Sequence, residues 1–374
     1  MAEHSTLNVK GFDKNTKIYV AGHRGLVGSA IWANLQKRGF TNLIGRTHGE
    51  LDLTDAEKVK EFFSTEKPEV VILAAAKVGG IMANSLYRAD FITENLAIQQ
   101  NVITQAWKHG VKHLIFLGST CIYPRNASQP ITEDCLLTSP LEYTNEPYAI
   151  AKISGMKMCE SLNLQYGTEY LSVMPTNLYG PNDNFDLEKS HVLPAMIRKI
   201  HLAKLLQENN FDAIRKDFSI RPYANINSST SDSEITESLN KLGIFHDRIE
   251  LWGSGRPLRE FLWSEDMADA TVHVLLNVTF NDLKKDCGDN VRNTHINIGT
   301  GIEHTIAETA SMVKEAVGYR GKIIWDSTKP DGTMRKLCDV SKLHALGWRH
   351  KMELKEGINE LYRWYKASSF PSRT

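Results

Sequence analysis

The sequence has few cysteines and no surplus of charge of either sign. Its 374 residues include five cysteines, and no two of them form a Cys-x-x-Cys pair. This excludes a disulfide framework or a zinc site of that type and favours a reducing compartment. Lysine plus arginine equals aspartate plus glutamate at 44 each, so the basic footprint of nucleic-acid binding is missing. We therefore expect no nucleic-acid partner and no bound metal.

Long hydrophobic runs are missing as well. No apolar stretch approaches the ~20 residues that a membrane-spanning helix requires. Residues 1–17 are polar and lack the hydrophobic segment of a signal peptide. We therefore expect a soluble, cytoplasmic protein with no membrane partner. Its length is sufficient for two domains around one cleft.

Apolar strands alternate with helical patterns through the first half of the chain. The strands are continuously apolar, as a parallel sheet covered by helices on both faces requires. Apolar positions at Val27, Ile31 and Leu35 have the spacing of a helix, and residues 91–107 are predicted to form another. The predicted strands are residues 17–21, 42–45, 70–76, 113–117 and 171–174.

After Gly180 the alternation ends and the composition changes. We expect a nucleotide-binding domain over residues 14–185, which residues 264–300 partly rejoin, and a smaller α/β substrate domain over residues 186–374. The polar segment 206–246 is predicted to be a surface insertion, and a solvated excursion is favoured over a functional lid. Within the second half, helical pieces are predicted at 211–216 and 234–242, ordered structure is expected to return at 249–255, and a strand is predicted at 295–299.

A glycine-rich turn separates the first predicted strand from the first predicted helix. The turn, Gly22-His23-Arg24-Gly25-Leu26-Val27-Gly28, has the spacing G-x-x-G-x-x-G. Glycines let the backbone approach a pyrophosphate, and the following helix N-terminus supplies amide donors. A generic tight turn is the alternative, but the residues downstream favour nucleotide binding. The sequence therefore predicts an α/β fold with a Rossmann-like, doubly wound parallel sheet.

The residues after the second strand favour NADP over NAD. Sites selective for NAD place an acidic residue about 20 residues beyond the turn, whereas arginine accommodates a 2′-phosphate. Here Arg46 follows the strand and Arg24 lies within the glycine turn. The alternative is that both arginines are solvated surface residues. Asp52 is placed either to meet the adenine edge or to cap the following helix.

A serine, a tyrosine and a lysine carry the catalytic prediction. Tyr148 and Lys152 are four residues apart, so in a helix they share one face. Ser119 follows a predicted strand and can point at the same position as the phenol. Such a trio suits proton transfer to a carbonyl oxygen while a cofactor delivers hydride to the carbon. Because ligands of doubly wound sheets bind outside the carboxyl ends of the strands, we expect the glycine turn, Ser119 and Asn177 to line one crevice.

Longer segments resemble the extended short-chain dehydrogenase/reductase family, and within it the group of GDP-L-fucose synthases. The likeness covers nearly the whole chain outside the polar insertion. It implies a GDP-sugar substrate, NADPH as cofactor and a homodimer. The segments that carry it are residues 74–81, 118–124, 145–152, 174–181, 190–195, 252–255, 259–262 and 329–333.

The resemblance implies a 3,5-epimerase and 4-reductase that acts on GDP-4-keto-6-deoxy-mannose. The ketone acidifies C3 and C5, and Cys121 and His191 are the implied acid/base residues for their inversion through enolates. Hydride then reaches C4 while Tyr148, its pKa lowered by the Lys152 charge, protonates the alkoxide. Ser119 donates to the oxyanion. Without the resemblance, Cys121 would be a small buried hydrophobe and His191 a capping or packing residue.

The resemblance also implies binding residues. Thr120 stands where a second serine is frequent, and Arg198-Lys199 replaces an arginine pair, which loses bidentate phosphate geometry at the lysine. The residues expected at the substrate are Asn177, Lys199, Trp252, Arg259, Asp331 and Lys336. The residues expected at the cofactor are Gly22, His23, Arg24, Gly25, Leu26, Val27, Gly28, Arg46, Asp52, Leu117, Gly118, Ser119, Thr120, Tyr148, Lys152, Pro175, Thr176, Asn177, Leu178 and His191.

Two other functions fit part of the pattern. A nucleotide-sugar 4,6-dehydratase, 4-epimerase or 4-reductase would keep the same glycine, serine, tyrosine and lysine set. Dehydratases carry an Asp-Glu pair directly after the serine or threonine, whereas this chain has Thr120-Cys121-Ile122. A non-catalytic NADP-binding regulator is the other alternative, but such proteins usually lose the tyrosine or the lysine, and both are present here.

Overall fold

The computed structural model describes residue 8 and residues 10–285, 287–329 and 331–368. The chain divides into two compact units, each assembled from separated parts of the sequence. Unit 1 comprises Met1–Leu178, Leu262–Gly301 and Leu337–Lys351. Unit 2 comprises Tyr179–Phe261, Ile302–Lys336 and Met352–Thr374. Residues 264–300 thus fall in unit 1, and so do residues 337–351, which the sequence had placed with the second half.

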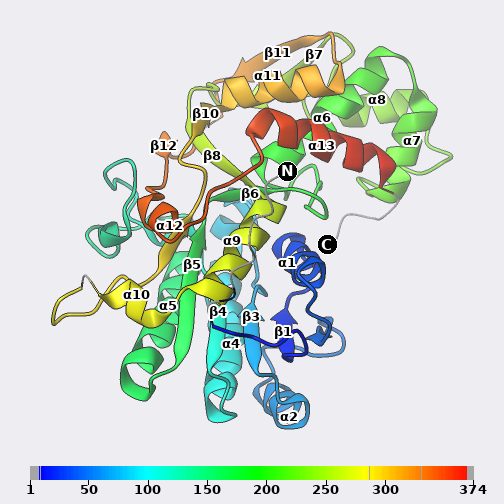
Figure 1. Ribbon diagram of the computed structural model, residues 1–374. Coiled ribbons are helices and arrows are strands. Elements are labelled where there is room, and N and C mark those ends of the chain that lie inside the picture. Colours follow the sequence, from blue (N-terminus) through cyan, green and yellow to red (C-terminus); the bar gives the residue numbers. More distant parts are fainter. Residues whose placement is uncertain (1–7, 9, 286, 330, 369–374) are drawn as a thin grey trace, which may run out of the picture. The chain divides into compact units, whose positions relative to one another are not determined.

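Unit 1 is built on a six-stranded sheet whose strands are all parallel (Figure 1). Strand order reverses at β1, which has β2 on one side and β3 on the other, so the sheet is doubly wound. The predicted Rossmann-like α/β fold is confirmed. In spatial order the strands are β2 (Leu43–Ile44), β1 (Ile18–Ala21), β3 (Val70–Leu73), β4 (His113–Leu117), β5 (Glu169–Pro175) and β9 (Ile296–Ile298).

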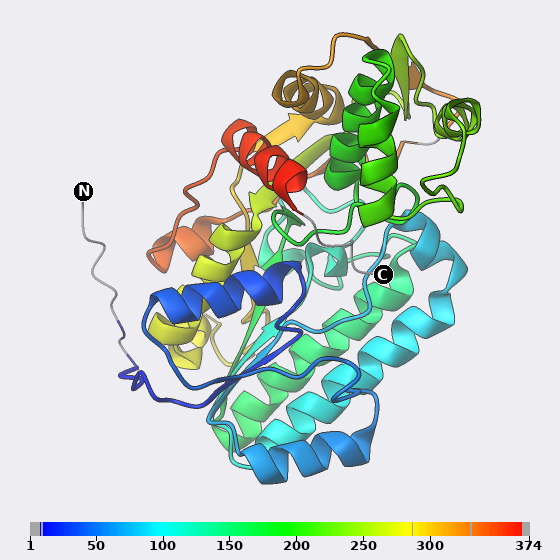
Figure 2. The ribbon, with the colours of Figure 1, turned by 90° about the vertical axis from the view of Figure 1, so that its right-hand side faces the viewer.

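Helices cover both faces of this sheet. In β1, Ile18 and Val20 belong to one core cluster, whereas Tyr19 and Ala21 belong to the other, because successive side chains of a strand point to opposite faces. The first face is covered by α1 (Leu26–Lys37) and α9 (Ser264–Asn277). The second is covered by α2 (Ala56–Glu66), α4 (Arg88–Lys108) and α5 (Glu146–Tyr166), and α4 and α5 lie side by side in Figure 2.

Shorter elements of unit 1 complete the connections between these strands and helices. Strand β3 ends at Leu73 rather than at the predicted Ala76, and residues 74–80 are irregular. Among the residues that the structure describes, no helix combines the length and the apolar character needed to cross a membrane. The shorter elements are α3 (Ile81–Leu86), η1 (Thr120–Ile122), η2 (Glu133–Cys135), α10 (Phe280–Lys284) and α12 (Ser341–Ala345).

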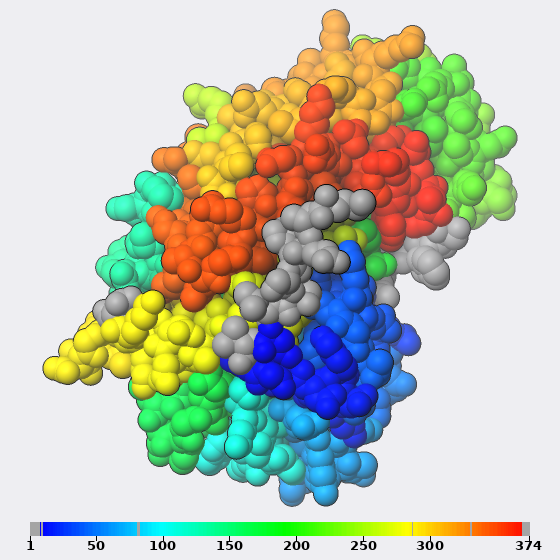
Figure 3. Space-filling model, in the orientation of Figure 1, coloured from blue at the N-terminus to red at the C-terminus, as the bar shows by residue number. Residues whose placement is uncertain are grey.

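Unit 2 contains two small sheets and five helices of ten or more residues within its described part. In it, α11 lies beside both α6 and α13, and the α11 and α13 surfaces adjoin in Figure 3. The helices are α6 (Val192–Gln207), α7 (Phe211–Ile220), α8 (Asp232–Lys241), α11 (Ile306–Val317) and α13 (Leu354–Ala367). The strands are β7 (Arg248–Trp252), β10 (Glu303–Thr305), β11 (Lys322–Asp326) and β12 (Arg335–Lys336), with β6 (Asn177–Tyr179) and β8 (Leu258–Trp263) spanning the limits of the two units.

The prediction that residues 206–246 form a solvated excursion is wrong. The segment begins inside α6 and continues into α7 and α8, each of which has one buried apolar face. A short stretch of sequence shows the polar outer face of such helices, whereas their burial depends on partners elsewhere in the chain. The buried apolar side chains are Leu206, Ile214, Phe218, Ile235, Leu239 and Ile244.

A buried charge cluster attaches α7 to the rest of unit 2. Arg198 of α6 donates to Asp217 of α7 at 2.9 Å, and Arg221 lies 3.3 Å from the other oxygen of the same carboxylate. Tyr365 of α13 donates its phenol proton to Asp217 and stacks against Arg221, whose guanidinium lies 3.9 Å from the ring centroid. All four side chains are buried. Removing a single partner would leave a buried charge uncompensated, so the cluster fixes three helices together.

Asp269 of α9 has a similar role in unit 1. Its carboxylate accepts from Asn34 on α1 at 3.2 Å and from Arg38, the C-cap residue of α1, at 2.6 Å. It also accepts from Trp348 at 3.1 Å and Lys351 at 3.0 Å. Burial alone would raise the pKa of Asp269, but these donors hold it well below its usual range. The carboxylate therefore joins α1, α9 and the segment after α12 through charge-assisted hydrogen bonds.

Asp269→Asn should lower the free energy of unfolding by about 2 kcal/mol, because the amide removes the charge that four donors share. Urea unfolding at neutral pH measures this change. Lys60→Gln is the control, since Lys60 and Glu57 form an exposed pair at 3.3 Å, and we expect a change below about 0.5 kcal/mol. Equal effects of the two substitutions would contradict the role of Asp269.

Candidate active site

The glycine turn lies where the order of the parallel strands reverses. Gly22 has a φ of +82°, and a Cβ atom there would lie 2.8 Å from the backbone nitrogen of Ala75, just beyond β3. A Cβ atom on Gly28 would lie 2.1 Å from the carbonyl oxygen of Gly22. Only glycine fits at these positions, because α1 packs directly against the turn. The first turn of α1 carries neither an acidic residue nor a side-chain cap, so its amide donors suit an anion.

Ser119 and Cys121 lie on the short turn that follows β4. Ser119 is the N-cap of η1, and its hydroxyl oxygen accepts from the Cys121 backbone N–H at 3.2 Å. This hydrogen bond fixes the two side chains relative to each other. Both residues are half-buried, so the hydroxyl and the thiol lie near the carboxyl edge of the sheet without being sealed in the core.

Helix α5 brings Tyr148 and Lys152 to the same place. The Lys152 amine donates to the Leu117 carbonyl at the end of β4 at 2.8 Å, and it lies 5.8 Å from the centroid of the Tyr148 ring. The Tyr148 phenol hydrogen-bonds the Ser119 side chain and lies within electrostatic range of Cys121. The structure therefore brings together the four catalytic residues that the sequence predicts in unit 1: Ser119, Cys121, Tyr148 and Lys152.

The expected effect of Lys152 on the Tyr148 pKa is wrong. Burial raises the pKa of the phenol, Cys121 raises it further, and only the Ser119 hydrogen bond opposes this rise. Burial also lowers the pKa of Lys152 to about 7. The cost of removing both groups from water outweighs their mutual attraction, since the Lys152 amine faces a backbone carbonyl rather than the phenol oxygen.

The residues after β4 and β5 lie on the same edge of the sheet as the glycine turn. The Gly118 N–H donates to Val173 O at 2.8 Å, and the Thr176 N–H donates to Ile298 O at 3.0 Å. These bonds continue the ladders of β4, β5 and β9 to the point where the polar side chains begin. Among the expected cofactor residues, the edge includes Leu117, Gly118, Thr120, Pro175, Thr176, Asn177 and Leu178, of which the Thr120 and Thr176 side chains are buried.

Arg46 is held by a carboxylate that the sequence did not identify. Its guanidinium lies 2.5 Å from Glu66 on α2 and 5.7 Å from the centroid of the Phe62 ring. Arg24 is exposed, and both arginines lie within electrostatic range of Glu50, whose pKa is lowered chiefly by hydrogen bonds from Thr47. Glu66 thus orients Arg46, and this pairing is set by how α2 packs.

The suggestion that Asp52 caps the following helix is wrong. Asp55 is the N-cap of α2 and accepts from the backbone N–H groups of Glu57 and Lys58. Asp52 instead accepts from the Thr54 backbone at 2.9 Å, and this bond lowers its pKa. The same carboxylate accepts from the Thr54 hydroxyl at 2.8 Å, in the loop between β2 and α2.

The unit 2 residues fall into two groups, and the first lies on α6. His191 is the N-cap residue of this helix, but its side chain makes no capping hydrogen bond and is exposed. The capping role considered for it is therefore wrong. The Lys199 amine donates at 3.2 Å to the carbonyl of Leu242, the C-cap residue of α8, and burial lowers its pKa. Arg198 belongs to the buried charge cluster, whereas Lys199 does not. The C-terminal end of helix α8 positions Lys199 through the Leu242 carbonyl.

The second group surrounds the loop after β7. Asp331 accepts from the Ser254 backbone at 2.8 Å and from its hydroxyl at 2.7 Å, which lowers the Asp331 pKa. Arg259 lies within electrostatic range of Asp331, and β12 places Lys336 beside Arg259. Trp252 is 60% exposed at the start of this loop. Four expected substrate residues therefore lie on neighbouring strands and loops of unit 2.

Two residues of this group were missed from the sequence. Ser254 fixes both oxygens of the Asp331 carboxylate, and the Lys329 amine lies 5.5 Å from the Trp252 ring centroid. Both residues belong to segments that carry the family resemblance. Ser254 lies close to Trp252 in the sequence and Lys329 lies close to Asp331. This closeness to expected binding residues is the feature of the sequence that could have identified them. The resulting surface combines an exposed indole with three cations and one oriented carboxylate.

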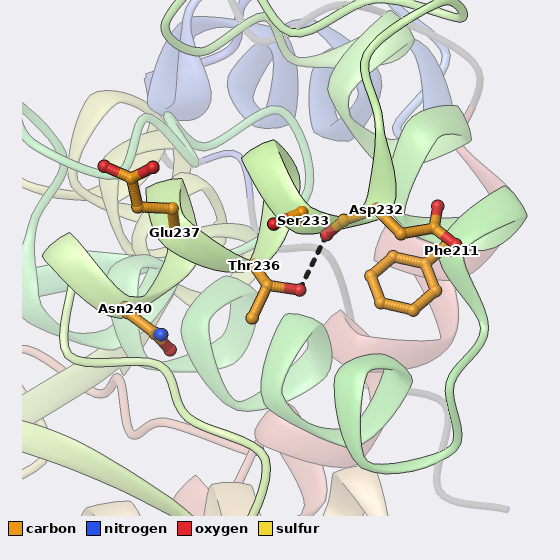
Figure 4. Close-up of a pocket in the computed structure, with 6 residues that line it drawn as sticks. All are labelled: Phe211, Asp232, Ser233, Thr236, Glu237 and Asn240. Atoms are coloured by element: carbon orange, nitrogen blue, oxygen red, sulfur yellow. Dashed lines mark hydrogen bonds between the residues drawn. The ribbon is translucent and has the colours of Figure 1, made fainter.

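A separate hollow of about 480 Å³ lies on α7 and α8 (Figure 4). None of the predicted site residues contributes to it. Two carboxylates on its wall would repel a diphosphate, so it does not suit the expected nucleotide. The lining residues are Phe211, Asp232, Ser233, Thr236, Glu237 and Asn240.

The sequence was compared with protein families and curated relatives. The profile of the NAD dependent epimerase/dehydratase family matches residues 18–226 and 222–299. GDP-L-fucose synthase 1 of Arabidopsis thaliana is 52% identical over 353 residues, which cover 94% of each chain. GDP-L-fucose synthase of Escherichia coli K12 is 45% identical over 354 residues, covering 93% of this chain and 96% of the relative.

Solved structures show the same similarity. A GDP-D-glycero-L-gluco-heptose synthase from Campylobacter jejuni, solved in the presence of NADPH, is 47% identical with a TM-score of 0.88. The similarity covers 95% of this chain and 100% of that one. A GDP-mannoheptose C4 reductase from the same organism, with NADP bound, is 46% identical with a TM-score of 0.84, covering 96% and 100% of the two chains.

Lys152→Met should flatten the pH dependence of stability between pH 7 and pH 9. The folded-state pKa of about 7 lies below the ordinary 10.5. The unfolded chain therefore binds more protons in this window, and the unfavourable contribution of Lys152 falls as pH rises, by about 2 kcal/mol in total. Urea unfolding of both proteins across the window measures the difference. Parallel slopes for wild type and variant would contradict a largely uncharged amine.

Proposed function

The chain belongs to the NAD dependent epimerase/dehydratase family, and we propose that it acts as a GDP-L-fucose synthase. It epimerises GDP-4-keto-6-deoxy-D-mannose at C3 and C5 and then reduces the C4 ketone to give GDP-L-fucose. The observation that carries this proposal is the convergence of a hydroxyl, a thiol, a phenol and a buried amine at the carboxyl edge of the unit 1 sheet. Relatives of this name are 45–52% identical over nearly the whole chain.

The reductive step uses Tyr148, Ser119 and Lys152. NADPH, when bound, supplies hydride to C4 of the sugar. Because its pKa is raised, the Tyr148 phenol stays protonated near neutral pH and can donate its proton to the alkoxide that forms. Ser119 hydrogen-bonds the same oxygen, and Lys152 holds α5 against β4, so that the donors are oriented before reaction begins.

The epimerising steps use Cys121 and His191. The C4 ketone acidifies the protons at C3 and C5, and each inversion requires a base on one face of the ring and an acid on the other. A thiol and an imidazole can each donate or accept a proton, as an inversion through an enolate requires. The hydrogen bonds from Ser119 and Tyr148 stabilise the enolate oxygen during these steps.

The cofactor is NADPH, held by the glycine turn and two arginines. The first turn of α1 has no side-chain cap and no acidic residue, which suits a pyrophosphate. Arg24 and Arg46 suit a 2′-phosphate, because arginine provides several donors in a fixed fork. Asp52, beyond β2, suits the adenine edge. Of the remaining expected cofactor residues, Tyr148 and Lys152 lie on α5, His191 directly precedes α6, and the others lie at the ends of β4 and β5.

The GDP-sugar is held by residues of unit 2 together with Asn177. Lys199, Arg259 and Lys336 supply positive charge for a diphosphate, Trp252 offers an exposed indole to a base or sugar, and Asp331 accepts hydroxyl donors. The Ser254 contacts support this assignment, since they hold the Asp331 carboxylate in one orientation before substrate arrives.

We further propose a cytoplasmic homodimer formed through α4 and α5. These neighbouring helices cover one face of the unit 1 sheet, and α5 exposes apolar side chains away from it. Ile150 is 40% exposed, Leu164 is 52% exposed and Tyr166 is 50% exposed. Exposed apolar side chains along a paired helix surface favour burial against a second copy.

A second candidate is the reduction of a GDP-4-keto-heptose at C4. One of the similar structures is named a GDP-mannoheptose C4 reductase at 46% identity, and such a reaction needs the same serine, tyrosine and lysine. The two candidates differ in whether C3 and C5 exchange their protons with solvent. Substrate choice and solvent exchange therefore separate them.

The wild-type protein should oxidise NADPH with GDP-4-keto-6-deoxy-mannose and release a GDP-6-deoxy-hexose inverted at C3 and C5. Tyr148→Phe should lower this reduction by at least about a hundredfold, because the proton donor is lost. Cys121→Ser should instead slow deuterium uptake at C3 or C5 in D2O. Absorbance at the nicotinamide band and mass spectrometry of the sugar measure these effects.

The opposite pattern would contradict the assignment. Turnover of a UDP- or dTDP-sugar without NADPH consumption on the GDP ketone would place the chain in another branch of its family. Wild-type deuterium uptake at both carbons in Cys121→Ser would remove the thiol from proton transfer. Exchange-free reduction of a GDP-4-keto-heptose would favour the second candidate.

Arg46→Ala should raise the KM for NADPH by about tenfold and leave the KM for NADH nearly unchanged, because a charge-assisted contact with the 2′-phosphate is worth about 1.4 kcal/mol or more. Steady-state kinetics with both cofactors measure the split. Lys58→Ala is the control for the loss of a positive charge, because Lys58 is exposed on α2. Arg38→Ala would not serve, because Arg38 binds Asp269. An equal change in both KM values would show that Arg46 does not select the cofactor.

A further inference from the structure

A buried chain of hydrogen bonds lies behind the turn that carries Ser119 and Cys121. The Tyr123 phenol lies 3.0 Å from Nε2 of His295 and 2.5 Å from Oδ1 of Asn297. Asn297 belongs to β9, and His295 immediately precedes this strand. Tyr123 is 2% exposed, and His295 and Asn297 are fully buried. Tyr123 is 172 residues from His295 in the sequence, so tertiary structure alone creates this contact.

The direction of each hydrogen bond follows from the partners. The Asn297 amide nitrogen donates to the carbonyls of Ile131 at 3.0 Å and Asp339 at 3.2 Å, so its oxygen is the acceptor that faces Tyr123. The phenol must therefore donate to Asn297 and accept from Nε2–H of His295. Burial keeps the pKa of His295 well below its ordinary value, so the ring is neutral. Only this assignment of donors and acceptors lets the Tyr123 phenol hydrogen-bond both Nε2 of His295 and Oδ1 of Asn297.

The backbone connects this chain to the catalytic turn. Tyr123 is the residue that closes η1, and its N–H points back to Thr120 O at 3.4 Å. At the other end of the turn, the Ser119 hydroxyl oxygen accepts from the Cys121 N–H. The turn is thus anchored at its start by Ser119 and at its end by the Tyr123 side chain.

The anchor lies on a different strand from the one that holds the reductive residues. Lys152 attaches α5 to β4, whereas β9 pairs with β5 and is the edge strand of the sheet. Asn297 is fixed in turn by Glu133, whose carboxylate accepts from the Asn297 backbone N–H at 3.0 Å. Movement of the Tyr123 side chain would therefore shift Cys121 without displacing Lys152.

We propose that Tyr123 is a positioning residue for Cys121, acting through its hydrogen bonds to His295 and Asn297. This rests on the proposed role of Cys121 in proton transfer at C3 and C5. Proton transfer depends steeply on distance and angle, so a loosened turn slows exchange at these carbons. Reduction at C4 depends on Tyr148, Lys152 and Ser119. Ser119 lies at the start of the turn, directly after β4, and Tyr123 lies at its other end, so reduction falls less than exchange does.

Tyr123→Phe tests this proposal, with Tyr170→Phe as its matched control. Tyr170 is equally buried and donates its phenol proton to Val111 O at 2.7 Å, but it lies at the opposite end of β5 from the catalytic turn. Each substitution removes one buried hydroxyl, so both should lower the midpoint of thermal unfolding. Only Tyr123→Phe should change the chemistry.

Two readouts report on Cys121 and one on reduction. Deuterium uptake at C3 and C5 of the GDP ketone, measured in D2O with NADP and without NADPH, should fall by about tenfold to a hundredfold in Tyr123→Phe. The pH profile of Cys121 alkylation by iodoacetamide, followed by peptide mass spectrometry, should shift. NADPH oxidation with ketone already epimerised by the wild type should stay within about threefold.

Uptake and alkylation in Tyr123→Phe equal to those in Tyr170→Phe would overturn the proposal. So would an equal loss of uptake and reduction, which would indicate a general structural role. If the variant does not fold, His295→Leu, which removes only the donor to the phenol, takes its place in the same assays. A wild-type protein with no uptake and no NADPH oxidation would instead refute the proposed function, while the alkylation profile still decides whether Tyr123 positions the thiol.

Discussion

The hydrogen bond from the Lys152 amine to the Leu117 carbonyl is the interaction on which the catalytic geometry depends. It joins α5 to the end of β4 at the point where Ser119 begins the next turn. A backbone carbonyl at a strand end has no partner within the ladder, and a buried amine needs an acceptor, so each satisfies the other. Once α5 is fixed in this way, Tyr148 has little freedom relative to Ser119.

Sequence alone predicts those parts of the fold that depend on local pattern. The strand over residues 113–117 has the predicted limits, because Leu114 to Leu117 form a continuous run of buried apolar residues after the half-buried His113. The helix that begins in the glycine turn was also predicted, since Ile31 and Leu35 recur at the helical period and are buried. The Ser119, Tyr148 and Lys152 set was found in the same way, because a strand end and a helix face determine where such side chains point.

The features that could not be predicted depend on partners far away in the chain. The apolar faces of α7 and α8 are buried in unit 2, which a short polar sequence does not reveal. Glu66 meets Arg46 only because α2 packs against β2 and β1. The pKa of Tyr148 was expected to fall but rises, since the balance between desolvation and the Lys152 charge is set by burial that a motif does not encode.

The separate supports of the turn and the helix explain how one site can perform two kinds of chemistry. Hydride transfer requires a fixed phenol, and the contact between α5 and β4 provides it. Proton exchange at C3 and C5 also requires an acid/base group, and the Cys121 thiol on the turn after β4 is the group proposed here. In this molecule the thiol turn is fixed from β9 through Tyr123, whereas the phenol is fixed from β4. The two supports meet at Ser119, which begins the thiol turn and hydrogen-bonds the phenol, so loss of the Tyr123 support should slow proton exchange more than reduction.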